Sequence, residues 1–232
     1  MSADLQTERT SKKSFYAITF SMILVIVIVG VIATKIVRDN ARKAEAREQI
    51  SMLKKALDKD DPISKRAAAA HKKYLIALDR ATVAGQKRHD DALSSDQSSD
   101  KYKHYVLIEQ SGVQDSTKFV GKEIDELDEE ISNFGEVLGY DFVRKNHDDV
   151  SAYRESRLAA LGTWQRGINE IVDESVAGRE LVPASVIRQT YDSVGEKMDR
   201  ANKLEETVIQ NSSDLYALIT KKLLAAGAVA GR

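Results

Sequence analysis

The chain contains four histidines, at His71, His89, His104 and His147. Imidazole binds metals and titrates near neutral pH, so it can serve in metal sites and in acid–base chemistry. None of the four stands in a HExxH pattern. None follows a glutamate at the spacing of the Glu-x-x-His motif that carboxylate-bridged di-iron bundles use. The spacing of the histidines therefore predicts no metal-binding residue.

Two His-Asp-Asp triplets occur, at residues 89–91 and 147–149. Adjacent residues on a helix point about 100° apart, so one triplet cannot chelate a metal ion alone. A site would require the two triplets to meet in the fold. We interpret both as exposed polar residues near helix ends.

An acidic run offers carboxylates to a cation or to a basic partner. It consists of Glu123, Asp125, Glu126, Asp128, Glu129 and Glu130. Such a run usually forms the solvated face of a helix, and we predict that role here. Asp58 to Asp61 lacks the glycine and the terminal glutamate of an EF-hand loop. Gly121 and Lys122 lack the earlier glycine and the Ser or Thr of a phosphate-binding loop.

The rest of the sequence offers no catalytic constellation. The chain has no cysteine, which excludes disulfides, thiolate metal sites and a cysteine nucleophile. Neither GxGxxG nor GxSxG occurs. Trp164 fits the apolar spacing of its helix, which predicts a core residue rather than a ligand platform. We therefore predict no catalytic, cofactor-binding or metal-binding residue and a non-enzymatic protein, with a metal-dependent enzyme as the weakest of three hypotheses.

The elements that position these residues begin with an apolar run near the N-terminus. The run extends from Ser14 to Thr34 without a charged residue, and a lysine flanks it on each side. As a helix it is about 31 Å long, which matches the hydrocarbon core of a bilayer, about 30 Å thick. We predict a single transmembrane helix over residues 14–35, after a polar tail over residues 1–13.

Two alternatives for this run are weaker. A cleaved signal peptide has a shorter apolar core, and a buried helix of a soluble protein carries a polar stripe that this run lacks. The side of the membrane that the C-terminal part faces stays open. Three basic residues precede the helix and five follow it, which favours the cytoplasm. A single anchor after a short basic N-terminus, however, often leaves the bulk of the chain outside.

Composition favours helices in the remainder of the chain. Charged residues make up 31% of the 232 residues and aromatic residues 6%, with two prolines and twelve glycines. Such a charge-rich, proline-poor chain favours helix over sheet. The net charge of −1 provides no overall field that would recruit nucleic acid. Residues 36–60 are rich in helix formers and predict a juxtamembrane helix or stalk.

Apolar residues three and four positions apart mark further helices, and each such row is called a seam below. The seams are Ile63, Ala67, Ala70, Tyr74, Ala77, Ala81 and Ala84; Val120, Ile124, Leu127, Ile131, Phe134 and Leu138; Val150, Tyr153, Leu161, Trp164, Ile168, Ile171 and Ser175; and Ile187, Tyr191, Val194, Met198, Ala201, Val208, Ser212, Leu215 and Ile219. Arg157 interrupts the third seam and Glu205 interrupts the fourth. Long helices bury such seams by lying side by side.

Turn-forming residues separate the predicted helices. The predicted breaks are Asp60 to Pro62, residues 94–100, residues 112–116, Gly139 with Asp141, and Gly178 to Pro183. Residues 101–110 fit either a short helix or a strand. The longest predicted helix begins at Pro183 and extends to about Ala226, before a flexible tail over residues 227–232.

These observations predict an all-α fold. A single transmembrane helix precedes an elongated antiparallel bundle of three to five helices, with coiled-coil-like seams, over residues 61–226. An intermolecular coiled coil is the runner-up, because it would use the same seams.

The predicted function is that of a membrane-tethered interaction protein: a scaffold, an adaptor or an assembly subunit of a complex in the plasma (inner) membrane. The expected partners are the bilayer, through the run from Ser14 to Thr34, and proteins, through the helical surfaces. The spacing of Gly30 and Thr34 adds weak support for self-association. We expect no nucleic acid and no cofactor. The alternative is a sensory or ligand-binding bundle: the layout resembles the sensing part of bacterial chemoreceptors, but we expect no second membrane helix and no output segment.

Overall fold

The computed structural model contains four helices and no strand over the residues that it describes. It describes the backbone of residues 3–94, 100–177 and 184–231, and the side chains of residues 32–90, 100–172 and 187–231. The helices are α1 (Ala3–Ser94), α2 (Asp100–Leu138), α3 (Tyr140–Ala177) and α4 (Ala184–Ala230). The predicted all-α class is confirmed, with a helix count inside the predicted range.

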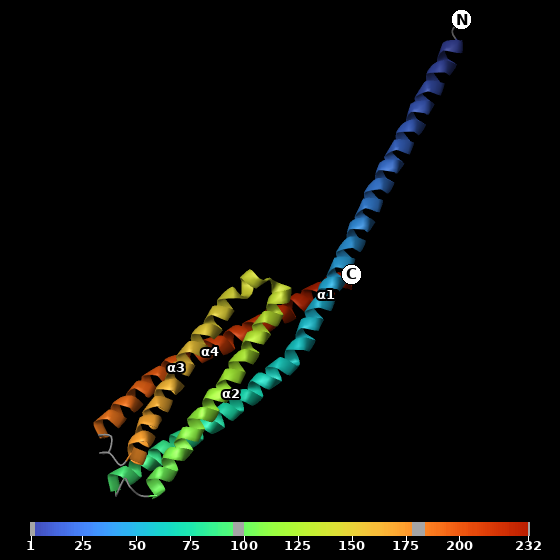
Figure 1. The fold of residues 1–232 in the computed structure, drawn as a ribbon. Coiled ribbons are helices and arrows are strands. Elements are labelled where there is room, and N and C mark those ends of the chain that lie inside the picture. The colour runs from blue at the N-terminus through green and yellow to red at the C-terminus, as the bar shows by residue number, and fades with distance from the viewer. Residues whose placement is uncertain (1–2, 95–99, 178–183, 232) are drawn as a thin grey trace. The chain divides into compact units, whose positions relative to one another are not determined.

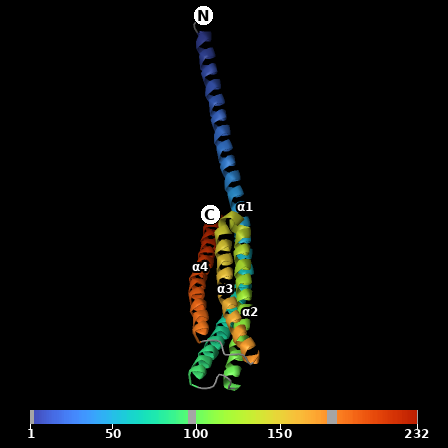
Figure 2. The same cartoon turned by 60° about the vertical axis from the view of Figure 1, so that its left-hand side comes forward.

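The larger of two compact units spans Met52–Lys221. Within it the four helices lie side by side, and consecutive helices run in opposite directions (Figures 1 and 2). This arrangement is an antiparallel helical bundle formed within one chain. The buried polar residues of α1, α2 and α3 belong to this unit.

The other unit consists of Met1–Ser51 and Lys222–Arg232. Ala46 and Ala226 are buried in it. The transmembrane helix predicted over residues 14–35 lies almost wholly outside the residues whose side chains are described. Over the described residues, no helix combines the length and the apolar character that crossing a membrane requires.

The predicted seams form the core of the bundle. Every member of the first seam is buried, as are the first five members of the second. The alanines of the first seam allow α2 to approach α1 closely. A Cβ atom added at Gly112 would lie 2.8 Å from the Cβ of Ala81, so the small residues on both helices set this close contact.

The turn predicted over residues 112–116 is wrong, because α2 is continuous there. Gly112 serves the helix contact rather than a turn. The buried hydroxyl of Ser116 donates to the carbonyl of Gly112 at 2.7 Å, which satisfies it inside the helix. The ambiguous residues 101–110 are helical as well.

The break predicted at Asp60 to Pro62 is also wrong, because α1 continues through Pro62. Proline lacks the N–H of a helical hydrogen bond and crowds the preceding turn, at a cost of about 3 kcal/mol. Burial on both sides offsets that cost, since Ala56 and Ile63 lie in the core. Tertiary packing therefore overrides local propensity, and α1 rather than α4 is the longest helix, with 92 residues against 47.

The junction of α2 and α3 follows the prediction at Gly139. This residue has φ of 95°, a backbone conformation that favours glycine. Its N–H donates to the carbonyl of Gly135 at 2.9 Å, and its carbonyl accepts from the N–H of Phe142 at 3.1 Å. The other two predicted connections, residues 94–100 and Gly178 to Pro183, lie largely outside the described residues.

Candidate functional site

Charged and polar side chains enter the core of the bundle at regular intervals. On α2, four of the buried polar residues are Glu109, Ser116, Glu123 and Glu130. They are seven residues apart, which is close to two helical turns and places them on one stripe of the helix. A matching row on α4 carries Tyr191, Met198, Glu205 and Ser212. Polar groups from these rows and from α1 and α3 meet in three layers.

The predicted solvated face of α2 is wrong for two of its six members. Glu123 is 3% exposed and Glu130 is 6% exposed, whereas Asp125 and Glu129 are exposed. Each buried glutamate directly precedes a buried seam residue, Ile124 or Ile131, and lies seven residues from the other on the same stripe of α2. Charge counting along the sequence misses this distinction within a single acidic run.

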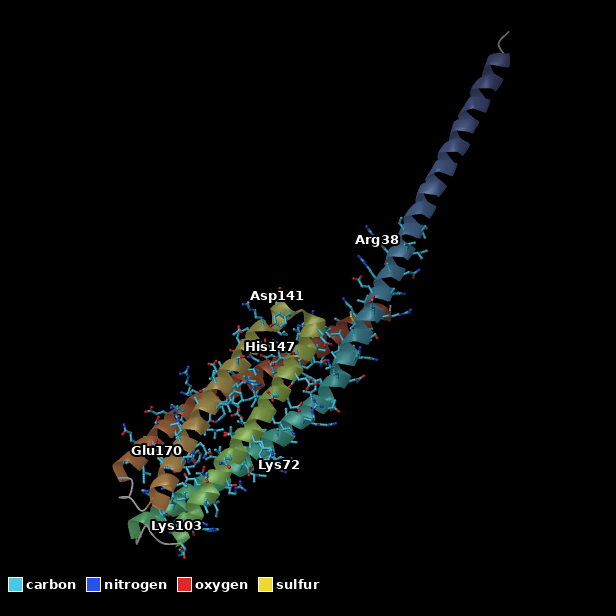
Figure 3. The ribbon with its side chains drawn as sticks, viewed as in Figure 1. Arg38, Lys72, Lys103, Asp141, His147 and Glu170 are labelled. Atoms are coloured by element: carbon cyan, nitrogen blue, oxygen red, sulfur yellow. The ribbon has the colours of Figure 1, made fainter. Side chains whose placement is uncertain are left out.

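The middle layer, called the His71 layer, contains His71 and Tyr74 of α1, Glu123 of α2, Tyr153 and Arg157 of α3, and Glu205 of α4. Nδ1 of His71 lies 3.0 Å from Oε1 of Glu123 and 3.3 Å from Oε1 of Glu205. Lys72, the next residue along α1, is exposed (Figure 3). His71 is therefore placed at the border between core and solvent, and its side chain is 34% exposed.

Arg157 provides the positive charge of the His71 layer. Its Nη2 donates to Oε2 of Glu205, and its Nη1 lies 3.4 Å from the sulfur of Met198. The guanidinium lies 5.4 Å from the ring centroids of both Tyr74 and Tyr153, within cation–π range. Four helices thus contribute to one buried electrostatic cluster.

The His71 layer is not fully satisfied by its own hydrogen bonds. Among the described residues, neither Oε2 of Glu123 nor the hydroxyl of Tyr74 has a hydrogen-bond partner. Burial raises the pKa of Glu123 to about 7, although the nearby His71 lowers it. Buried polar atoms in proteins nearly always have a partner, so these two atoms leave hydrogen-bonding capacity for an additional polar group.

The second layer, called the Arg88 layer, contains Arg88, Glu109, Trp164 and Tyr191. Nε of Arg88 donates to Oε2 of Glu109 at 2.8 Å, and the indole N–H of Trp164 donates to Oε1 at 2.8 Å. The hydroxyl of Tyr191 also donates to Glu109 and accepts from Arg88. Both oxygens of Glu109 therefore have hydrogen-bond partners. The adjacent cavity, beside Trp164 and Tyr191, has a volume of about 10 Å³, which is too small for a ligand.

The third layer, called the Asp60 layer, contains Asp60, Glu130, Asn133 and Ser212. Ser212 donates to Oε1 of Glu130, and Asn133 donates to the backbone carbonyl of Ala56 at 2.8 Å. Burial, followed by the charge of Glu130 and then of Asp61, raises the pKa of Asp60 to about 7. Burial also raises the pKa of Glu130. This layer brings two carboxylates together without a cation among the described residues.

The other histidines do not assemble into a site within the described residues. His89 and His104 are exposed. Figure 3 shows Asp141 at the turn between α2 and α3 and His147 further along α3, where Nδ1 of His147 lies 2.7 Å from Oδ1 of Asp128. The side chain of Asp91 lies outside the described residues. The described members of the two His-Asp-Asp triplets do not share a metal-ligand cluster.

One cluster with metal-ligand chemistry does arise, and sequence reasoning missed it. The ligand atoms of His71, Glu123 and Glu205 all lie within 4.8 Å of one another. The three residues come from three helices, so no spacing along the chain could reveal them. The available signal was the interruption of two seams by Arg157 and Glu205. Trp164, predicted to be a core residue, is buried.

Comparison with protein-family models, curated proteins and solved structures found no match. Function must therefore be argued from the chemistry of the chain itself.

Proposed function

We propose that this chain is a membrane-tethered, non-catalytic helical bundle that works by contacting other proteins. The charge-free run from Ser14 to Thr34 carries the proposal, because its length as a helix matches a bilayer core. Three large apolar side chains at and just beyond its end, Ile32, Ile36 and Val37, are more than half exposed. Apolar side chains in that position suit contact with lipid.

The bundle supports a role in protein contacts. The apolar seams of the bundle are largely buried within one chain. On α1, however, Leu75, Ile76 and Val83 are exposed. Residues 76 and 83 are about two turns apart and share a face of the helix. An apolar stripe on an otherwise charged surface suits a protein partner.

Fractionation tests the tether. We expect the full chain to stay in the membrane pellet after an alkaline wash, and a chain without residues 1–35 to be released. Release of the full chain by the wash would overturn the tether. Because the chain has no cysteine, Ser151→Cys on the exposed surface of α3 provides a single label for an impermeant maleimide. Labelling of intact cells would place the bundle outside, and labelling only after lysis would place it inside.

Site-specific crosslinking tests the contacts. A photoreactive residue at Ile76 should give discrete adducts in cells, and the same residue at Ser151 should not. Equal adduct patterns at both positions, or none at either, would contradict a role for the α1 stripe.

A sensory or ligand-binding bundle is the second candidate, favoured by the unpartnered buried atoms of the His71 layer. A ligand that binds only the folded state raises the melting temperature of the chain, and the rise continues as the ligand concentration increases above the Kd. A compound that stabilises the full chain, but not a variant altered in the His71 layer, would support this candidate over the first.

A further inference from the structure

We propose that His71, Glu123 and Glu205 form a binding site for a divalent transition-metal ion of the zinc class. The site is independent of the membrane tether and goes beyond the function proposed above. Its ligands would be Nδ1 of His71 and one carboxylate oxygen from each glutamate. They come from α1, α2 and α4, so a bound ion would link three of the four helices of the bundle.

The distances suit such an ion. Zinc takes nitrogen ligands at about 2.0–2.1 Å and carboxylate oxygens at about 2.0–2.2 Å in a tetrahedral arrangement, which separates neighbouring ligand atoms by about 3.3 Å. Nδ1 of His71 lies 3.0 Å from the Glu123 oxygen and 3.3 Å from the Glu205 oxygen. All three atoms lie within 4.8 Å of one another. Small rotations of the two long glutamate side chains would complete the geometry.

Unpartnered groups provide an independent indication. Glu123 is 3% exposed, and its second oxygen has no hydrogen-bond partner among the described residues. The hydroxyl of Tyr74, a residue that is 1% exposed, is equally unpartnered among the described residues and lies in the same layer. The buried carboxylate of Glu123, beside an imidazole, therefore lacks a partner for one of its two oxygens. An ion and its bound water would supply the missing partners.

Charge balance favours a cation. The layer holds two carboxylates and one guanidinium, so with a neutral His71 the net formal charge is −1. Arg157 already donates to Oε2 of Glu205. This contact orients Oε1, the other oxygen, toward His71. Since His71 has a single Nδ1, a proton on it can bridge only poorly to two carboxylates, whereas a metal ion engages all three groups at once.

The ligand set selects the class of metal. A mixture of imidazole and carboxylate suits zinc and related transition ions, whereas calcium and magnesium prefer oxygen ligands alone. Three protein ligands leave at least one coordination position for water. The partial exposure of His71 provides a route from solvent.

Metal titration of the full-length chain tests the proposal. The protein, kept in detergent and stripped with a chelator, is titrated with Zn²⁺ by calorimetry and with Co²⁺ by visible absorption. We expect one ion per chain and the visible Co²⁺ bands of a site with few ligands.

Matched variants locate the site. His71→Asn keeps a donor toward Glu123 but removes the metal ligand, and Glu123→Gln removes a carboxylate without changing its shape. Second-shell changes weaken metal binding by about 10–100-fold, so each of these losses should exceed about 100-fold. The control is His147→Asn, which alters a histidine that also contacts one carboxylate but has no third ligand among the described residues. It should change the affinity by less than about twofold.

Either of two results would overturn the site. The first is that the unaltered chain binds no stoichiometric metal, which would leave only a hydrogen bond between His71 and Glu123. The second is that His71→Asn and His147→Asn bind metal equally well. Helical content measured by circular dichroism separates loss of the site from loss of the fold. We expect it to be unchanged in His71→Asn and Glu123→Gln, because each variant retains a hydrogen-bonding side chain.

Discussion

The guanidinium of Arg157 on α3 donates a hydrogen bond to the carboxylate of Glu205 on α4, across 48 residues of sequence. Each residue interrupts the apolar seam of its own helix. In the fold the two interrupting residues lie side by side along the bundle, so they pair with each other. The side chains are 1% and 12% exposed, so water contributes little to the solvation of either charge.

Removing one member of this pair should be costly. Arg157→Met leaves Glu205 without its cation beside a second carboxylate, Glu123. We expect the free energy of unfolding to fall by about 3 kcal/mol, the range in which breaking a buried ion pair falls. Chemical denaturation followed by circular dichroism measures this change.

A double-mutant cycle supplies the control for the same pair. Glu205→Leu alone leaves Arg157 unpaired and should also destabilise the chain. The double variant, Arg157→Met with Glu205→Leu, should recover most of the loss, because an apolar pair can replace a buried ion pair at little cost. Additive losses in the double variant would mean that the two residues act independently.

The helical seams could be predicted from the sequence, and the polar layers could not. Ile63 to Ala84 repeats at three-four spacing, and periodicity reports burial directly. Pro62 and Gly112 each predicted a break in a helix. Both predictions were wrong, because packing against a neighbouring helix decides the backbone conformation at these residues. Glu123 and Glu130 look like surface residues until the register between helices is known. His71, Glu123 and Glu205 lie on separate helices, so only the folded chain brings them together.

The buried carboxylates of the Asp60 layer should make stability depend on pH. The pKa of Asp60 is raised from 3.8 to about 7, so the folded chain holds this proton more tightly than the unfolded chain. The free energy of unfolding therefore falls as pH rises from about 4 through about 7. Asp60→Asn removes this contribution, and the variant should be more stable than the unaltered chain by up to about 4 kcal/mol at pH 8, with little difference near pH 4.

Denaturation at a series of pH values checks this expectation. Asp125→Asn is the control, because Asp125 is exposed and pairs with Arg154 at the surface. It should change stability by less than about 1 kcal/mol at every pH. If Asp60→Asn and the unaltered chain keep a constant difference in stability from pH 4 to 8, Asp60 does not hold a raised pKa.

Two glycines of α2 should respond oppositely to alanine. A Cβ atom at Gly112 would lie 2.8 Å from the Cβ of Ala81 and 2.9 Å from its backbone, so the helices must separate. We expect Gly112→Ala to destabilise the bundle by about 1–3 kcal/mol. Gly121 has nothing within 4 Å, so Gly121→Ala should gain up to about 1 kcal/mol from helix propensity. Melting temperatures of the two variants that move in the same direction would contradict the close contact of α1 and α2.

Glu109 should be the most sensitive residue of the Arg88 layer, since it accepts from Arg88, Trp164 and Tyr191 together. Glu109→Gln keeps the shape but leaves the charge of Arg88 buried without a counter-ion, and we expect a loss of about 2–4 kcal/mol. Trp164 is the single tryptophan of the chain, so its fluorescence reports unfolding from within this layer. Asp115→Asn removes an exposed partner of Arg80 and should cost less than about 1 kcal/mol. Equal losses for the two variants would mean that burial adds nothing to the pair of Arg88 and Glu109.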